Sequence, residues 1–404
     1  MKSVKFAAIA LGLGLVACCS KENHKMGSYG YDVEFFRKNN IESIELTSPD
    51  GQQRILVVPG YQGRVMTSTA QGEKGSTLGW INYEYIESGE LSPQFNPYGG
   101  EERFWFGPEG GPFSLYFKPG AEQVYENWLV PPVIDTEGWE IASKSSRSVS
   151  FNHPAKLVNA SGTEFSIHVE RTVTLLDKEG LLSVFGVSLE PGMQAVAYTT
   201  DNKVTNTGPE AWSKEKGLVS VWMLCMMPPT PTTTVFIPYK SDAEGTIVND
   251  EYFGKVPADR LIVEKGIIYF KIDGLFRSKI GIPSQRALPV CGSYDSQKGL
   301  LTLLQTTLPE TPGEYVNGQW GFQEHPYEGD VINSYNDGPK GGSDAPGLFY
   351  EIETSSPALS LLPGASAIHS QSLVHILGTE SQIAAVVQSL FGIELSEISG
   401  KFVK

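Results

Sequence analysis

Residues 96–120 read NPYGGEERFWFGPEGGPFSLYFKPG, and this stretch says most about the fold. Side chains alternate between the two faces of a β-strand, so Phe104 and Phe106 fall on one face together. Two phenylalanines in that position suit the space between packed sheets. The opposite face carries an acid, a guanidinium and an indole, contributed by Glu101, Arg103 and Trp105. The pattern predicts a strand with one buried face and one chemically active face.

The active face has the side chains of a sugar-binding site. A flat indole covers the apolar face of a pyranose, while charged groups bind its hydroxyls. Trp105, Arg103 and Glu101 therefore form a candidate carbohydrate site. A surface Arg–Glu pair beside a half-buried tryptophan is the structural alternative. Glu109 follows in the turn GPEGGP, where its carboxylate either caps backbone amides or contacts the ligand.

In the rest of the chain, turn residues are distributed as in an antiparallel β protein. Its 43 glycines and 26 prolines are spread along the length and separate short β-branched or alternating runs. Runs of this kind, bounded by turn residues, indicate a sandwich or a barrel. They cover residues 54–58, 164–176, 181–189, 218–226, 261–272, 300–306, 349–354 and 373–377.

One segment alone has helical periodicity, namely Thr379 to Phe391. An α/β fold would need several such helices, so we expect an all-β protein with few short helices. The longest stretch that we expect to be irregular is 318–347, and a loop of that length in a compact domain is more often functional than idle.

The N-terminus predicts export. Lys2 and Lys5 precede an apolar run over 6–16, which is too short to span a bilayer as a helix. The next residues, Leu-Val-Ala-Cys at 15–18, resemble the lipobox of bacterial lipoproteins, in which Cys18 is the acylated residue. The alternative is a plain secretory signal cut near Ala17. We expect a signal peptide over 1–17 and a lipidated flexible tether over 18–30, which place the protein in the cell envelope, on the periplasmic face or the outer membrane, held to the membrane by its lipid alone.

Charge excludes one class of partner. The chain has 31 basic and 46 acidic residues and a formal net charge of −15. A surface this acidic argues against nucleic acid. The chain holds 40% hydrophobic residues, which is ample for a folded core.

The cysteines and short motifs give little sign of a cofactor. Cys225 and Cys291 either pair in an oxidising compartment or are buried free thiols. The sequence has no HExxH, CxxC, phosphate-binding loop or dinucleotide fingerprint, so we expect neither a metal nor a cofactor. Oxygen-bearing side chains in 318–347 could coordinate Ca²⁺, but their spacing matches no EF-hand loop.

Three stretches together resemble the galactose mutarotase-like superfamily, which includes aldose 1-epimerases and a branch of lipoproteins. They are GGEERFWFGPEGG at 99–111, ENWLVPPVIDTEGWEI at 126–141 and FYEIETSSPALSLLPGASAIHSQSLVHIL at 349–377. The resemblance covers most of the chain in order. It implies a β-supersandwich of large antiparallel sheets, here one domain over 31–404, with a carbohydrate site on a concave face.

The resemblance also implies roles for single residues. Aldose epimerases use a glutamate in an E-T-x-x-x-P context as general base, and Glu353 fits by its following threonine, although the proline comes one residue early. Arg103 matches the arginine that contacts sugar hydroxyls. By alternation Glu351 shares the face of Glu353, and two close carboxylates raise the pKa of one of them. Two solvent-facing acids on an outer strand are the alternative.

The acid partner is harder to assign. The family uses mid-chain histidines, but neither His153 nor His168 lies in its motif. His325-Pro326-Tyr327 is similar to the family's H-x-Y-F element but stands 28 residues before Glu353, whereas the family places it much further upstream. His325 nevertheless precedes the Glu353 strand in the long polar loop and is our candidate acid.

Other side chains in and near that loop suit hydroxyl recognition. The candidates for substrate binding are Trp320, Asn333, Asn336 and Asp337. Arg277 and Lys279 share a face of a short strand and could oppose the carboxylates, while exposed basic residues on a β surface are the simpler explanation.

Three functions follow from these residues. The first is a pocket that binds a mono- or oligosaccharide and carries out mutarotase-type acid/base chemistry. The second is a lipoprotein that binds glycans without catalysis. The third is glycoside cleavage by two carboxylates about 5–10 Å apart, with Glu101 or Glu109 facing Glu353.

Overall fold

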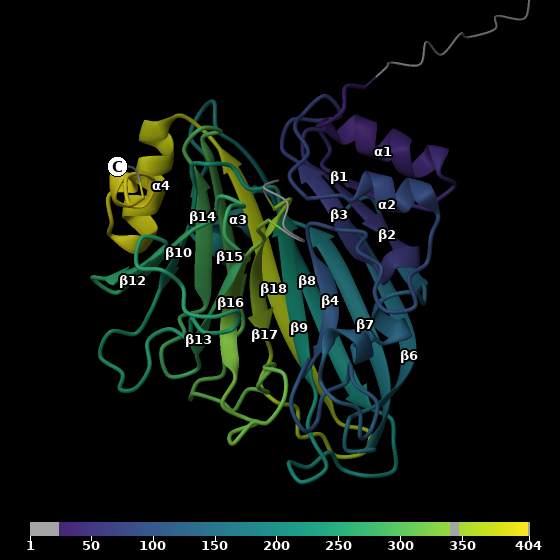
Figure 1. Ribbon diagram of the computed structural model, residues 1–404. Coiled ribbons are helices and arrows are strands. Elements are labelled where there is room, and N and C mark those ends of the chain that lie inside the picture. Colours follow the sequence, from purple (N-terminus) through teal and green to yellow (C-terminus); the bar gives the residue numbers. More distant parts are fainter. Residues whose placement is uncertain (1–23, 340–346, 403–404) are drawn as a thin grey trace, which may run out of the picture.

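The protein consists mainly of antiparallel strands in three sheets, as a computed structural model of residues 24–339 and 347–402 shows (Figure 1). Ten strands form the largest sheet, in the order β11-β12-β10-β14-β15-β18-β8-β7-β6-β5. Their bounds are β5 Glu140–Lys144, β6 Ser148–Val158, β7 Glu164–Leu175, β8 Gln194–Asn206, β10 Thr233–Pro238, β11 Leu261–Glu264, β12 Ile267–Lys271, β14 Val290–Asp295, β15 Leu300–Thr306 and β18 Ser366–Leu377.

A five-stranded sheet packs over the ten-stranded one. Its order is β13-β16-β17-β9-β4, which brings together strands from distant parts of the chain. The bounds are β4 Arg103–Gly107, β9 Ser220–Met227, β13 Ser278–Pro283, β16 Asp330–Asn336 and β17 Tyr350–Ser355. The main hydrophobic core lies between the two sheets and includes Phe104, Phe106, Cys225 and Ile352.

A small sheet joins the N-terminal part of the chain to this sandwich. It consists of β1 Ile44–Thr47, β2 Arg54–Val58 and β3 Arg64–Thr69. The helices α1 Tyr29–Lys38 and α2 Tyr83–Ser88 lie against it, and Tyr29, Phe36 and Met66 form a core of their own there (Figure 1).

The outer face of the ten-stranded sheet is covered near β10, β14 and β15 by short helices. They are α3 Lys178–Phe185, α4 Glu380–Phe391 and α5 Leu395–Ser399, whose buried residues share a core with Phe236, Leu301 and Val374. Among the described residues, no helix is both long and apolar enough to cross a membrane. Short 3-10 turns occur at Pro59–Tyr61, Tyr125–Asn127 and Pro132–Ile134.

The structure confirms the predicted antiparallel β fold and the helix near the C-terminus. Thr379 caps α4 through a reciprocal contact with Gln382, which satisfies free amide groups of the first turn. Several local predictions were wrong. The run 181–189 overlaps α3, because Asp177 accepts a hydrogen bond from Gly180 N and so caps a helix at this point. The stretch 318–347 is not irregular throughout, since it contains β16.

Two predictions concern the start of the chain. The signal peptide over 1–17 and lipidated Cys18 lie outside the described residues. Most of the tether predicted over 18–30 also lies outside them; of its last residues, Tyr29 is fully buried and its backbone amide donates to Gly75 O. Of the alternatives for Cys225 and Cys291, the structure shows buried free thiols.

Candidate active site

The candidate site lies on the face of the five-stranded sheet that points away from the ten-stranded sheet. Strand register places Arg103, Leu224, Glu353 and Asn333 in one row across β4, β9, β17 and β16. The adjacent rows add Trp105, Trp222 and Ser355 on one side and Lys279, Tyr335 and Glu351 on the other. Directly paired residues share a face, so these rows bring charged and aromatic side chains together on one face of the sheet, with Leu224 among them.

Glu353 lies at the centre of this surface and is fully buried. Its Oε2 accepts hydrogen bonds from Lys279 Nζ at 2.8 Å and from Trp222 Nε1 at 2.9 Å. Its Oε1 has no hydrogen-bond partner in the structure. Burial acts to lower the pKa of Lys279, but the negative charge of Glu353, with those of Glu109 and Glu351, outweighs it and raises that pKa.

Arg103 and Glu351 form a second buried ion pair beside the first. Arg103 Nη2 lies 3.0 Å from Glu351 Oε1, and the guanidinium carbon lies 4.2 Å from the centre of the Trp105 ring. Burial raises the pKa of Glu351 to about 7, Arg103 opposes that shift and Glu353 adds to it. Arg103 Nε and Nη1 have no hydrogen-bond partner, so both nitrogens remain available to donate to another group.

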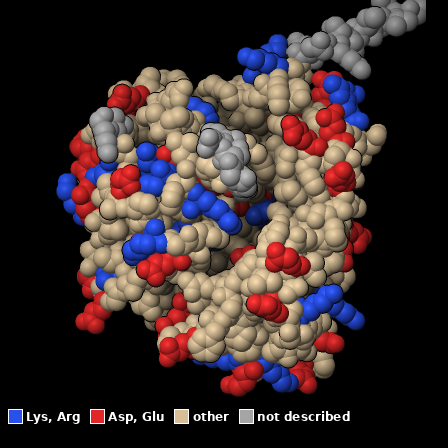
Figure 2. Space-filling model, in the orientation of Figure 1, with Lys and Arg blue, Asp and Glu red and all other residues tan. Residues whose placement is uncertain are grey.

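Above these pairs opens a cavity of about 840 Å³, which we call the aromatic pocket. Figure 2 shows a hollow in this face of the molecule. Six aromatic side chains line the pocket, namely Tyr125, Trp128, Trp222, Tyr252, Phe253 and Trp320. Trp128 is stacked with Tyr125 and with Trp320, each at 6.2 Å between ring centres. Trp128 Nε1 and Ser220 Oγ, which belong to lining residues, are buried without a partner.

Glu109 lines the same pocket. Burial raises the pKa of its carboxyl, Lys279 opposes the shift, and Glu353 adds to it. Glu109 in turn raises the pKa of Lys279, so the carboxylate on the turn that follows β4 interacts electrostatically with the Lys279–Glu353 pair. The sequence left open whether Glu109 caps backbone amides or contacts a ligand. Its position in the pocket lining favours contact with a ligand.

Asp330 also lines the aromatic pocket, at the start of β16. Its Oδ2 accepts hydrogen bonds from Tyr252 Oη at 2.5 Å and from Asn249 Nδ2 at 3.3 Å. Burial raises the pKa of Asp330 to about 6, and the hydrogen bonds from Tyr252 and Asn249 limit the rise. Asn333 Nδ2 donates to Tyr252 Oη, which extends the network into the sheet.

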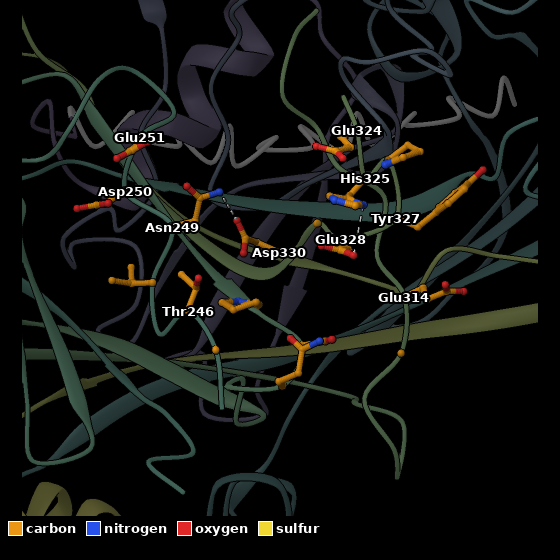
Figure 3. A pocket seen from close by; sticks show the side chains of 18 of the residues that line it. Thr246, Asn249, Asp250, Glu251, Glu314, Glu324, His325, Tyr327, Glu328 and Asp330 are labelled. Atoms are coloured by element: carbon orange, nitrogen blue, oxygen red, sulfur yellow. Dashed lines mark hydrogen bonds and ion pairs between the residues drawn. The ribbon is translucent and has the colours of Figure 1, made fainter. Parts of the chain in front are cut away.

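A second cavity of about 1120 Å³ adjoins the first, and we call it the acidic pocket. Figure 3 shows its carboxylates, among them Asp250, Glu324 and Glu328, around an open space. His325 belongs to this pocket and not to the aromatic one. Its Nδ1 lies 3.6 Å from Glu328 Oε1, and its side chain is exposed.

The structure thus brings together part of the predicted site. Glu351, Glu353, Arg103, Glu109 and Trp320 lie in or directly beneath the aromatic pocket. Trp105 lies below the floor, buried among Phe95, Tyr116, Trp128 and Trp222, so it supports the site and does not line it.

Three other residues predicted to bind the ligand line neither pocket. Glu101 is buried elsewhere, where it accepts from Ser68 Oγ at 2.8 Å and lies 3.3 Å from His375 Nε2. The chain is irregular before β4, which breaks the alternation assumed for Glu101. Asn336 accepts from Gly274 N and donates to Phe276 O. Asp337 accepts from Tyr335 Oη and Leu348 N, so both stabilise loops.

Sequence reasoning missed Trp222, Tyr252 and Asp330, and it favoured an exposed surface for Lys279. Alternation along β9 was the available signal for Trp222, because its neighbours Val221 and Met223 are core residues. Tyr252 lies in a loop, where no periodicity applies. In the described part of the chain, no group of three or more His, Cys, Asp or Glu side chains is placed to hold a metal ion.

The sequence matches, over residues 27–402, a family described as a family of unknown function, DUF6786. The chain belongs to this family. No curated protein sequence matches it. Solved structures share the fold of this DUF6786 protein at low identity.

A galactose mutarotase-like protein from Lactobacillus casei ATCC 334 is 10% identical, with a TM-score of 0.50 over 83% of this chain and 100% of that one. The Slr1438 protein from Synechocystis sp. PCC 6803 is 12% identical, with a TM-score of 0.50 over 83% and 96%. A protein from Escherichia coli K12, described as a candidate aldose 1-epimerase, is 14% identical, with a TM-score of 0.49 over 83% and 99%. The likeness is one of fold: a mostly β, galactose mutarotase-like architecture.

Proposed function

We propose that this DUF6786 protein binds a carbohydrate in the aromatic pocket. The observation that carries the proposal is the pairing of six aromatic rings with polar groups that have no protein partner. Pockets for small molecules are mostly apolar, with a few placed polar groups that fix orientation. Aromatic faces suit the C–H surface of a pyranose, and Ser220 Oγ and Trp128 Nε1 suit its hydroxyls.

The specific version of the proposal is interconversion of anomers. A base takes the proton of the anomeric hydroxyl while an acid protonates the ring oxygen, so the bond from the anomeric carbon to the ring oxygen breaks and an open-chain aldehyde forms. Reclosure on the other face, with both proton transfers reversed, gives the second anomer. Glu353 is the proposed base through Oε1. Glu109 is the proposed acid, because its raised pKa favours the protonated form.

One observation favours a second candidate, binding without catalysis. Glu353 is fully buried, and Lys279 and Trp222, which hold its Oε2, line the pocket. A carboxylate that is tied to an ammonium group is a weaker base, because the positive charge stabilises its ionised form. In this version Lys279 and Trp222 hold the sugar directly, and the ion pair keeps them in place.

Polarimetry separates the two candidates. Freshly dissolved α-D-glucose and α-D-galactose should equilibrate faster with the protein than in buffer, and the rate should fall at least a hundredfold for Glu353→Gln and for Glu109→Gln. A wild-type rate equal to that of buffer would remove the catalytic version. A glycan array then tests binding alone, which should survive Glu109→Gln if the protein does not catalyse, because that variant leaves the Lys279–Glu353 pair in place. Sugar products released from oligosaccharides would instead indicate cleavage by Glu109 and Glu353.

We also propose that the protein is held at the cell envelope by a lipid on Cys18. The support is the sequence at 15–18, and the first described residues lead directly into α1 at the surface of the small sheet (Figure 1). Membrane fractionation of wild type and of Cys18→Ser tests this. The wild type should sediment with membranes and the variant should not; equal distribution of the two would contradict the proposal.

A further inference from the structure

The two cavities adjoin at shared side chains. Asp330 and Glu251 line both the aromatic pocket and the acidic pocket. Ligand pockets for drug-sized molecules occupy about 300–1,000 Å³, so the aromatic pocket alone, at about 840 Å³, already holds more than one small sugar ring requires. With the acidic pocket of about 1120 Å³ beside it, the site has the dimensions of a cleft for a longer molecule.

The divide between the pockets is a fixed structure. Asp330 is held by Tyr252 and Asn249, both from the loop that follows β10. Gly281, on the neighbouring strand β13, leaves the room that this carboxylate needs, because a Cβ at that position would lie 2.0 Å from Asp330 Oδ2. Asp330 is thus placed at the junction, where a carboxylate can accept hydroxyl hydrogen bonds from either side.

We propose that the acidic pocket holds the second residue of a neutral oligosaccharide whose first residue lies in the aromatic pocket. This inference rests on the proposed function and specifies its substrate class. Oligosaccharide residues are covalently linked, so they require cavities that meet, as these two do at Asp330. The side chain of Tyr327 offers an apolar surface in the acidic pocket, and its ring is stacked on Phe113 at 6.1 Å.

Charge narrows the substrate class further. Seven of the side chains that line the acidic pocket are carboxylates, against one lysine and one histidine. Lys255 is already within 2.7 Å of Asp250, and His325 faces Glu328. A cleft with a strong negative field repels anionic ligands. Hydroxyl groups of a neutral sugar can still donate to its carboxylates, so uronates and sialylated glycans are excluded and neutral chains are accepted.

A glycan array with neutral and acidic glycans, and with the monosaccharide that ends each of them, tests the inference on the full chain. Thr246 is exposed and lines the acidic pocket alone, so Thr246→Trp places an indole in that pocket and leaves the residues of the aromatic one unchanged. We expect wild type to bind neutral glycans of two or more residues at least tenfold more tightly than the terminal monosaccharide. Thr246→Trp should reduce the affinity for these glycans to that for the monosaccharide. Thr246→Ser should change neither affinity.

Each other outcome has a defined meaning. Equal binding of monosaccharides and oligosaccharides by the wild type, oligosaccharide binding that survives Thr246→Trp, or preference for acidic glycans would each overturn the inference while leaving the proposed function intact. Absence of binding to any glycan would remove the proposed function itself. Unchanged monosaccharide binding by Thr246→Trp shows that the variant is folded, and Glu324→Trp, at another exposed lining position, provides an independent block.

Discussion

Lys279 Nζ lies 2.8 Å from Glu353 Oε2, in an ion pair whose carboxylate is fully buried and whose lysine lines the aromatic pocket. The two residues belong to β13 and β17, which are separated in the sheet by β16. Trp222 Nε1 donates to the same carboxylate oxygen, so one oxygen of Glu353 is fully engaged and the other is unpartnered. We therefore expect the stability of the fold, and the proposed binding of a sugar, to depend on this pair.

Removal of the lysine should destabilise the fold strongly. Lys279→Met leaves the Glu353 carboxylate buried without its counter-charge, and loss of one partner of a buried pair costs about 3–5 kcal/mol. Urea unfolding measures this. The double variant Lys279→Met/Glu353→Met should recover most of the loss, because no unpaired charge remains. Lys203→Met is the matched control: Lys203 pairs with Glu170 at 2.6 Å, but their side chains are 40% and 43% exposed, so the expected change is below about 1 kcal/mol.

Trp320 should contribute to sugar binding. It lines the aromatic pocket against Trp128, whereas Phe322, two residues away in the same loop, is 93% exposed and lines neither pocket. Trp320→Ala should weaken binding of an array-positive glycan about tenfold, or by about 1.4 kcal/mol. Phe322→Ala should leave it unchanged. Calorimetric titration gives both values, and an equal effect of the two substitutions would place the sugar outside the aromatic pocket.

Asp330 should make the protein less stable as the pH rises. Its pKa is raised to about 6 in the folded state from an ordinary 3.8, so folding favours the protonated form. That stabilisation is present below pH 3.8 and is lost as the pH rises through 6. Between pH 4 and 7 the free energy of unfolding should fall by roughly 2 kcal/mol more for wild type than for Asp330→Asn. Chemical denaturation at the two pH values tests this, and parallel curves would contradict it.

His369 should make the protein less stable as the pH falls. It is buried between the sheets with Nε2 2.9 Å from Thr354 Oγ1, and burial lowers its pKa from 6.5 to about 4. The neutral form is favoured in the folded state, so the stabilisation is present above pH 6.5 and is lost as the pH falls through 4. His369→Gln should therefore lose roughly 2–3 kcal/mol less than wild type between pH 7 and 4.5. Thermal unfolding at both pH values is the measurement, and a larger loss in the variant would refute the assignment.

Much of the fold was predictable from the sequence. Short apolar runs bounded by turn residues predicted strands such as 54–58 and 300–306, which match β2 and β15. Burial of Phe104 and Phe106 between the sheets followed from the same alternation. The prediction failed where local rules were interrupted, as at Glu101, where the chain leaves regular strand geometry, and at 181–189, where a capped helix replaced the expected strand.

The candidate site was predictable only in part. Glu351 and Glu353 share a face because alternation along one strand requires it. The sequence offered Lys279 opposite the carboxylates only as the less favoured of two alternatives. Nothing local indicated that His325 would lie in a separate cavity, because loop conformation and strand order depend on packing across the whole domain.

The sequence by itself determined which side chains share a strand face, because successive side chains of a β-strand point to opposite faces. Only the tertiary structure decided which faces meet. Arg103 and Glu351 are 248 residues apart in sequence and 3.0 Å apart in space, because β4 and β17 both pair with β9. Register between distant strands is fixed by burial of the common core, and that long-range constraint leaves no pattern in any short stretch of sequence.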